Sequence, residues 1–188
     1  MFPCLNEIII RSNDSEILKN LSCVSSTQVF TIRFESINLD TFTFLQVTGH
    51  KTITTVILEK VRFSFIDENT SFLIQSDDIV LANLTMIECE LNDPRLINIF
   101  GRIKVKKALE VKKCDIDMEI LAVMMGKDRL GELKKLELKE NKMKNYQRLN
   151  MKKLEALTKI KIVNNKIYSE ENISMHQICA FPTKTDQN

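Results

Sequence analysis

The chain has 188 residues, of which 44% are hydrophobic, so it is long enough to bury one sizeable core and we expect a single domain. No run approaches the roughly 18 apolar residues that a membrane-spanning helix needs, and we expect neither a transmembrane helix nor a signal peptide. The formal net charge of +2 hides an asymmetry: residues 1–100 carry 7 Lys and Arg against 13 Asp and Glu, whereas residues 101–188 carry 20 against 12.

Seven segments along the chain share one spacing of apolar residues, in which positions one, four, six and eleven are apolar. They begin near residues 5, 29, 53, 81, 106, 133 and 157, so the period runs from 24 to 28 residues. Of 28 apolar positions only Ser15 and Lys106 fail, against about 12 matches expected by chance. A repeat of this length predicts a stack of similar structural units.

The two clearest segments are residues 133–143 and 157–167, and both read LxxLxLxxNxL. In this motif the sequence resembles the leucine-rich-repeat family. The resemblance implies an α/β solenoid of about seven repeats: a curved right-handed coil with parallel strands on its concave face and short helices or irregular turns on its convex face. Residues 1–182 would form this one domain, residues 168–182 would close its last turn, and residues 183–188 would form a flexible tail.

The physical basis of the motif is that its fourth and sixth positions send two side chains from a short strand into the core. Its ninth position favours Asn or Cys, because a small polar side chain can bond the backbone of the neighbouring turn. Asn13, Cys89, Cys114, Asn141 and Asn165 obey this preference. The second and third repeats instead carry Ile37 and Val61, and there we expect a looser turn.

The connectors between these segments differ in apolar spacing. Helical spacing occurs at residues 17–24, 96–103 and 121–125, and more loosely at 146–154. Asp93 and Pro94 are predicted as the cap and first residue of the second of these helices. The connectors at 42–47 and 65–74 are richer in Thr, Phe and Ile, and we expect them to be extended or to form short 3₁₀ turns.

The outward positions of the predicted strands are the candidate binding surface. The adjacent isoleucines Ile57 and Ile87 are a possible hot spot, although single exposed isoleucines are common on protein surfaces. The partner-binding prediction comprises Arg33, Glu35, Ile57, Glu59, Thr85, Ile87, Glu110, Lys112, Glu137, Lys139 and Lys161.

Lysines dominate the C-terminal half of this predicted face. We place Lys112, Lys113, Lys135, Lys139, Lys159 and Lys161 there, interrupted by Glu110, Glu137 and Glu140. Such a surface would attract an acidic protein or, weakly, an RNA backbone. The alternative is ordinary cross-strand pairing of Lys with Glu on a solvated face.

No constellation for catalysis or metal binding is visible in the sequence. The two histidines, His50 and His176, do not neighbour a nucleophile or metal ligands at a suitable spacing, and four glycines form no phosphate loop. Cys89 and Cys114 occupy equivalent positions of successive repeats, and we expect them to be buried neighbours rather than a zinc or redox pair. We therefore expect no enzyme, no cofactor and no metal.

The cysteines, five in number and without a CxxC pair, and the lack of a visible signal peptide favour the cytoplasm or nucleus. Five Asn-x-Ser/Thr sequons would matter if the start of the chain were truncated and the protein were secreted. The expected function is that of a monomeric protein-interaction module or adaptor. The alternatives are a repeat protein of an RNA machine that uses the basic half, and a regulatory subunit of a GTPase or phosphatase.

Overall fold

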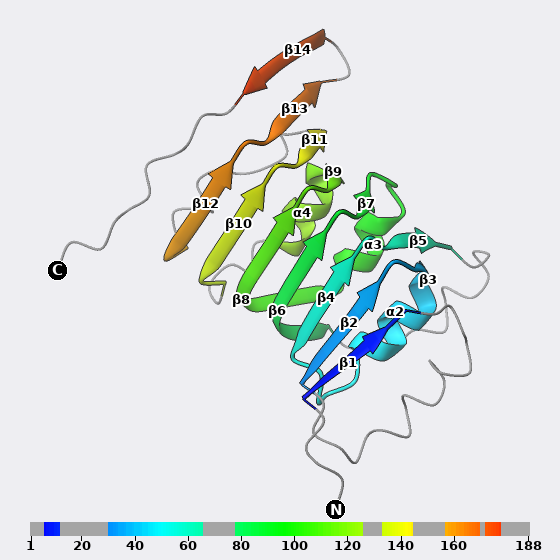
Figure 1. The fold of residues 1–188 in the computed structure, drawn as a ribbon. Coiled ribbons are helices and arrows are strands. Elements are labelled where there is room, and N and C mark those ends of the chain that lie inside the picture. Colours follow the sequence, from blue (N-terminus) through cyan, green and yellow to red (C-terminus); the bar gives the residue numbers. More distant parts are fainter. Residues whose placement is uncertain are drawn as a thin grey trace, which may run out of the picture.

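The computed structural model describes residues 6–11, 30–65, 78–125, 133–144, 157–169 and 172–177. Within these residues the fold is mixed α/β, with mostly parallel strands and three short helices (Figure 1). No described helix is long and apolar enough to cross a membrane. The predicted helices at 17–24 and 146–154, most of the connector at 65–74, and the tail 183–188 lie outside the described residues.

The larger of the sheets has seven strands, and their order in space follows their order in the chain. Each strand pairs in parallel with the next of the set. The strands are β1 (Glu7–Ile10), β2 (Thr31–Glu35), β4 (Thr55–Glu59), β6 (Ile79–Ile87), β8 (Ile103–Lys112), β10 (Lys135–Lys139) and β12 (Lys159–Val163).

The pairing register places equivalent positions of the sequence motif opposite one another. The fourth positions form one row across the sheet: Ile8, Ile32, Val56, Leu84, Leu109, Leu136 and Ile160. The five inner members of this row are buried, whereas Ile8 and Ile160, on the two outermost strands, are half-buried. A slip of one residue would turn this apolar row towards solvent, so burial fixes the register.

One irregularity interrupts the register between β6 and β8. Leu81 pairs with Val105, and a bulge then shifts the pairing so that Asn83 lies opposite Ala108. Val105 is buried and Lys106 is exposed. The apolar position that Lys106 fails to fill in the motif is therefore filled by its neighbour, because the bulge accommodates one extra residue.

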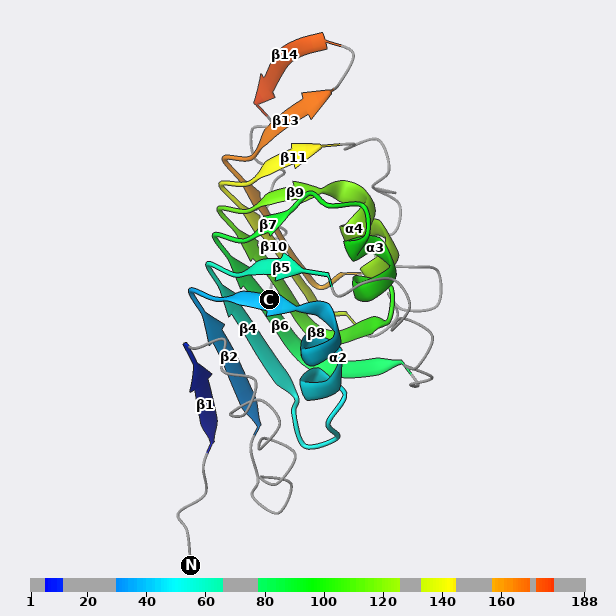
Figure 2. The same cartoon turned by 90° about the vertical axis from the view of Figure 1, so that its right-hand side faces the viewer.

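A shorter strand follows each of the six long strands from β2 to β12. With β14 these strands form a second row, divided into a two-stranded and a five-stranded sheet, that the sequence analysis did not predict (Figure 2). They bury the eleventh position of the motif at Leu39, Leu91, Ile116 and Met143. In the segment predicted to close the last turn, the final short strand runs antiparallel to the one before it. The short strands are β3 (Asn38–Asp40), β5 (Arg62–Ser64), β7 (Glu90–Leu91), β9 (Asp115–Asp117), β11 (Lys142–Lys144), β13 (Lys166–Ser169) and β14 (Asn172–Gln177).

Each of six turns between a long and a short strand contains one residue in the left-handed conformation. Its φ is 53° to 58° at Ser36, Lys60, Glu88, Lys113, Glu140 and Asn164. At the first five of these, the backbone N–H donates to a carbonyl of the next long strand at 2.8–2.9 Å, which offsets the cost of a positive φ in a residue other than glycine. The looser turn expected beside Ile37 and Val61 is wrong, since both turns have this geometry and both side chains are buried.

The ninth position forms a buried polar ladder through four successive turns. Asn165 Oδ1 accepts from the Asn141 backbone N–H at 3.0 Å, and Asn141 Oδ1 accepts from the Cys114 N–H at 2.9 Å. The Cys89 N–H in turn lies 3.4 Å from Cys114 Sγ. The Asn141 and Asn165 amide groups also donate to Val111 O and Leu138 O at 2.9 Å.

This ladder confirms the prediction that Cys89 and Cys114 are buried neighbours. The hydrogen bond to Cys89, together with burial, raises the pKa of the Cys114 thiol, so this thiol stays protonated at neutral pH.

The connector at 42–47 is a helix, α2 (Thr41–Thr48), so the expectation of an extended or 3₁₀ segment is wrong. Asp40 caps it, since its carboxylate accepts from the Thr43 backbone N–H at 2.7 Å. Phe44, Leu45, Val47 and Thr48 are buried. Burial of these side chains outweighs the weak helix propensity of Thr, Phe and Val.

The helix predicted at 96–103 is shorter than expected: α3 (Leu96–Phe100) begins after Arg95, and Ile103 already belongs to β8. Asp93 and Pro94 form the turn before it, in which the Asp93 carboxylate accepts from the Arg95 N–H at 2.9 Å. The segment at 121–125 lies at the end of α4 (Met118–Met124).

The three helices lie on one side of the seven-stranded sheet (Figure 2). Four phenylalanines join the layers there, because Phe44 of α2 lies 6.4 Å from Phe34, 5.3 Å from Phe63 and 5.9 Å from Phe100 between ring centroids. Such edge-on and tilted aromatic pairs add about 0.5–1.5 kcal/mol each beyond burial. The core therefore lies between the sheet and the helices, and the opposite sheet face carries no described helix.

Asn141→Ala tests the ladder. It leaves the buried Cys114 N–H without its acceptor and removes one donor from the Val111 carbonyl, so we expect the free energy of unfolding to fall by about 1–3 kcal/mol. Urea denaturation followed by circular dichroism measures this loss. Asn38→Ala is the matched control, because Asn38 is exposed and its loss should cost less than about 0.5 kcal/mol. Equal stability of the two variants would argue against the ladder.

Candidate functional site

We call the outward positions of the seven long strands the strand face. Strand register aligns them in three rows. The first row is Glu7, Thr31, Thr55, Asn83, Ala108, Lys135 and Lys159. The middle row is Ile9, Arg33, Ile57, Thr85, Glu110, Glu137 and Lys161. The third row is Glu35, Glu59, Ile87, Lys112, Lys139 and Val163. All eleven residues of the partner-binding prediction lie in the second and third rows, and their role in binding stays a prediction.

Ion pairs cross the first three strands. Arg33 lies 3.3 Å from Glu7 and 3.0 Å from Glu59, and Arg11 lies 2.9 Å from Glu35. These side chains are 27–66% exposed, and pairs of this kind contribute about 0–1 kcal/mol each. Their main effect is to neutralise the charges at this end of the strand face.

The middle of the strand face is nearly free of charge. We call Thr55, Ile57, Asn83, Thr85 and Ile87, on β4 and β6, the central belt. Ile57 pairs with Thr85, and Asn83 donates to the Thr55 hydroxyl at 3.0 Å. The two isoleucines are half-buried between neighbouring side chains rather than fully exposed. The belt therefore presents short polar groups around two aliphatic side chains.

A lysine–glutamate cluster occupies the other end of the strand face. Its members are Glu110, Lys112, Lys135, Glu137 and Lys161. Glu137 is 7% exposed, and its oxygens lie 3.2 Å from Lys135, 3.5 Å from Lys161 and 3.7 Å from Lys112. Glu110 accepts from Lys112 at 2.7 Å and also pairs with Lys135. The cross-strand Lys–Glu pairing considered from the sequence is therefore present.

Burial alone would raise the pKa of Glu137, but the hydrogen bond from Lys135 and the charges of Lys112, Lys135 and Lys161 outweigh it and lower the pKa below its usual range. The hydrogen bond that Lys135 donates to Glu110 raises the pKa of Lys135. Both groups are therefore ionised at neutral pH.

Two residues assigned to this face from the sequence lie elsewhere. Lys113 and Glu140 are left-handed turn residues, and Lys113 pairs with Glu88 at 3.4 Å. The partner-binding prediction drew on two of the three outward rows and left out the first, which contains Glu7, Thr55 and Asn83. The third position of the motif is the signal that identifies this first row.

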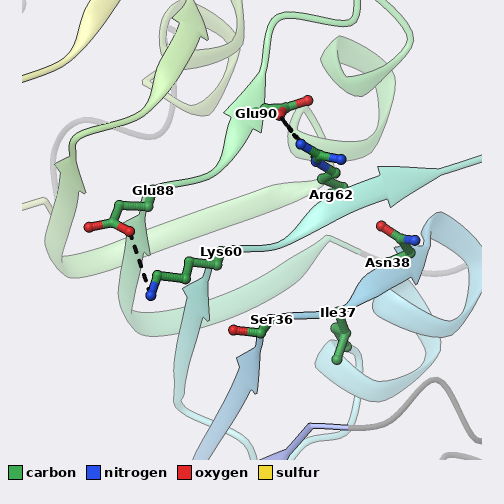
Figure 3. A pocket seen from close by; sticks show the side chains of 7 residues that line it. All are labelled: Ser36, Ile37, Asn38, Lys60, Arg62, Glu88 and Glu90. Carbon is green, nitrogen blue, oxygen red and sulfur yellow. Dashed lines mark hydrogen bonds and ion pairs between the residues drawn. The ribbon is translucent and has the colours of Figure 1, made fainter.

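A groove of about 500 Å³ lies over the turns after β2, β4 and β6 (Figure 3). Its charged groups pair with one another: Lys60 lies 3.8 Å from Glu88, and Arg62 lies 3.0 Å from Glu90. These pairs already satisfy the charges that would recognise a small ligand. The groove is lined by Ser36, Ile37, Asn38, Lys60, Arg62, Glu88 and Glu90.

Among the described residues no group of three or more His, Cys, Asp or Glu side chains could hold a metal ion. His50 Nδ1 lies 2.9 Å from the Thr52 hydroxyl, at the end of the connector after α2. Neither residue belongs to the strand face or to the groove.

Comparisons of the chain with protein-family models, curated proteins and solved structures gave no significant match. The resemblance to leucine-rich repeats therefore rests on the residues of the chain itself.

Glu137→Gln tests the lysine–glutamate cluster. It removes the buried charge, so at pH 7 we expect a loss of about 1–3 kcal/mol in the free energy of unfolding. Because the pKa of Glu137 is lower in the folded state, its contribution is fully present above its unfolded pKa of about 4.3 and is lost as the pH falls through the folded pKa. Urea denaturation from pH 7 to pH 3 should show the difference from wild type shrinking towards zero.

Glu35→Gln is the matched control for this series, because its ion pair with Arg11 is more exposed and the loss at pH 7 should stay below about 1 kcal/mol. A difference between Glu137→Gln and wild type that is the same at pH 3 and pH 7 would contradict the ionic role of Glu137.

Proposed function

We propose that the chain is a leucine-rich-repeat solenoid of about seven repeats that binds another protein through the strand face and catalyses no reaction. The repeat assignment is supported by the agreement between motif and pairing. Positions four and six, identified from the sequence, are aligned in each neighbouring pair of long strands. The polar ladder at position nine, through Asn141 and Asn165, gives the Asn preference of the motif a physical cause.

The central belt is the observation that carries the binding proposal. Protein interfaces have a core depleted of charge and a rim that is polar and solvated. The belt provides such a core around Ile57 and Ile87, with the Arg33 ion pairs on one side and the lysine–glutamate cluster on the other. The helices cover the reverse of the sheet (Figure 2), so among the described elements this face is left for a partner.

The double variant Ile57→Arg/Ile87→Arg tests this proposal. A large cation at each position blocks close approach and introduces two charges that an apolar contact would have to desolvate. Affinity capture from the native cell, quantified by mass spectrometry, should recover a specific partner on wild type and at least tenfold less on the variant.

Phe42→Arg is the control, with a large cation added at an exposed hydrophobic residue of α2, outside the strand face. It should recover the partner as wild type does, and circular dichroism should show that both variants are folded. Equal recovery on the strand-face variant and on wild type would refute binding through the central belt.

A further inference from the structure

Three exposed lysines lie where the pairing of β8, β10 and β12 begins, and we call them the lysine rim: Lys107 inside β8, just before its pairing with β10, Lys134 just before β10, and Lys159 at the start of β12. Backbone pairing holds them together, because the Lys134 N–H donates to Lys107 O at 3.1 Å and the Lys159 N–H donates to Lys134 O at 2.9 Å. Among the described residues no carboxylate pairs with any of the three. The rim is therefore a set of like charges without compensation in the described part of the chain.

The neighbouring cluster adds to this positive charge instead of cancelling it. Its three lysines, Lys112, Lys135 and Lys161, already neutralise Glu110 and Glu137 and leave one positive charge in excess. Both glutamates are ionised and paired with these lysines, Glu137 buried and Glu110 half-buried, so they do not pair with the rim. An anionic group approaching this end of the strand face meets a net attraction.

We propose that the partner of the strand face contributes an acidic segment that crosses β8, β10 and β12, with an apolar side chain on the central belt. This inference rests on the proposed function and adds the chemistry and direction of the bound segment. Its apolar part lies over Ile57 and Ile87, and its carboxylates point to the lysine rim. Charge complementarity of this kind fixes the orientation of a bound chain and raises its rate of association.

The dimensions of the sheet set the length of that segment. Neighbouring strands are about 4.8 Å apart, so β6 and β12, which are separated by three pairings, lie roughly 14 Å from each other. A helix spans this distance in about ten residues at 1.5 Å per residue. Carboxylates three or four residues apart on a helix are roughly 5–6 Å apart, which is close to the spacing of successive lysines.

An acidic protein segment fits this surface better than a nucleic acid. Single-stranded nucleic acid is usually held by aromatic rings that stack on its bases, and no outward position of the described long strands carries an aromatic side chain. The carboxylates of Glu110 and Glu137 also interrupt the basic surface where a continuous phosphate backbone would pass. Two isoleucines beside the lysines suit a side chain of a protein.

Fluorescence anisotropy with the full chain tests the proposal. The probe is a labelled twelve-residue peptide with two leucines in its first turn and six glutamates after them. A second peptide replaces the glutamates with glutamines, and a ten-nucleotide oligouridylate represents RNA. We expect the glutamate peptide to bind at least tenfold more tightly than the glutamine peptide and the RNA, with an affinity that falls as salt is added.

The chain offers a closely matched pair of variants. Lys134→Glu/Lys159→Glu reverses two charges of the rim, and Lys142→Glu/Lys166→Glu reverses two exposed, adjacent lysines on β11 and β13, outside the strand face. The rim variant should lower the affinity for the glutamate peptide at least tenfold, and the control variant less than twofold. Circular dichroism should show that both variants are folded. The proposal would be overturned if the two variants weakened binding equally, if the chain bound the glutamine peptide as tightly as the glutamate peptide, or if it bound the RNA more tightly than the glutamate peptide.

The same variants separate this inference from the proposed function. If a captured partner is lost with Ile57→Arg/Ile87→Arg but is retained with Lys134→Glu/Lys159→Glu, the acidic segment is wrong and binding through the central belt stands. If no partner depends on either pair, the strand face is not the binding surface.

Discussion

Parallel pairing between equivalent residues of successive repeats is the constraint on which the rest of the molecule depends. It brings the ninth positions close enough for Asn165 to accept from Asn141, and Asn141 from Cys114. Water cannot satisfy these groups, because all three residues are at most 1% exposed. The left-handed residues Lys113 and Glu140, beside Cys114 and Asn141, bond the next turn in the same direction. Each of these turns is thus held by the next one.

The same pairing makes the two faces of the sheet different from each other. Alternation along each strand sends positions four and six to the helices and positions three, five and seven to the opposite face. Charges that are far apart in the sequence become neighbours there, as at Glu137, which lies within 4 Å of lysines from three strands. The strand face is therefore divided into a neutralised end, a central belt and a basic end. That division is what gives the proposed partner a direction.

Sequence reasoning identified the long strands and two of the three outward rows, because apolar spacing alone determines which side chains are buried. It failed where backbone geometry or tertiary packing determines the local conformation. The turns at Ile37 and Val61 keep the shared conformation, since their stabilising bonds come from the backbone. The helix after Asp40 forms through burial that its propensities do not reveal. The bulge that puts Val105 in place of Lys106 depends on pairing with β6. Distances within the lysine–glutamate cluster follow from strand register and could not be obtained from composition.

Native-state hydrogen exchange followed by NMR tests the central claim most directly, because it reports on single backbone amides. The account predicts that the amides of Cys89, Cys114 and Asn141, which donate to buried side chains of the next turn, belong to the slowest-exchanging class, together with the inner strands. A register shifted by one residue would expose these amides to water. Exchange of all three within about tenfold of the rate of an unprotected amide would contradict the account.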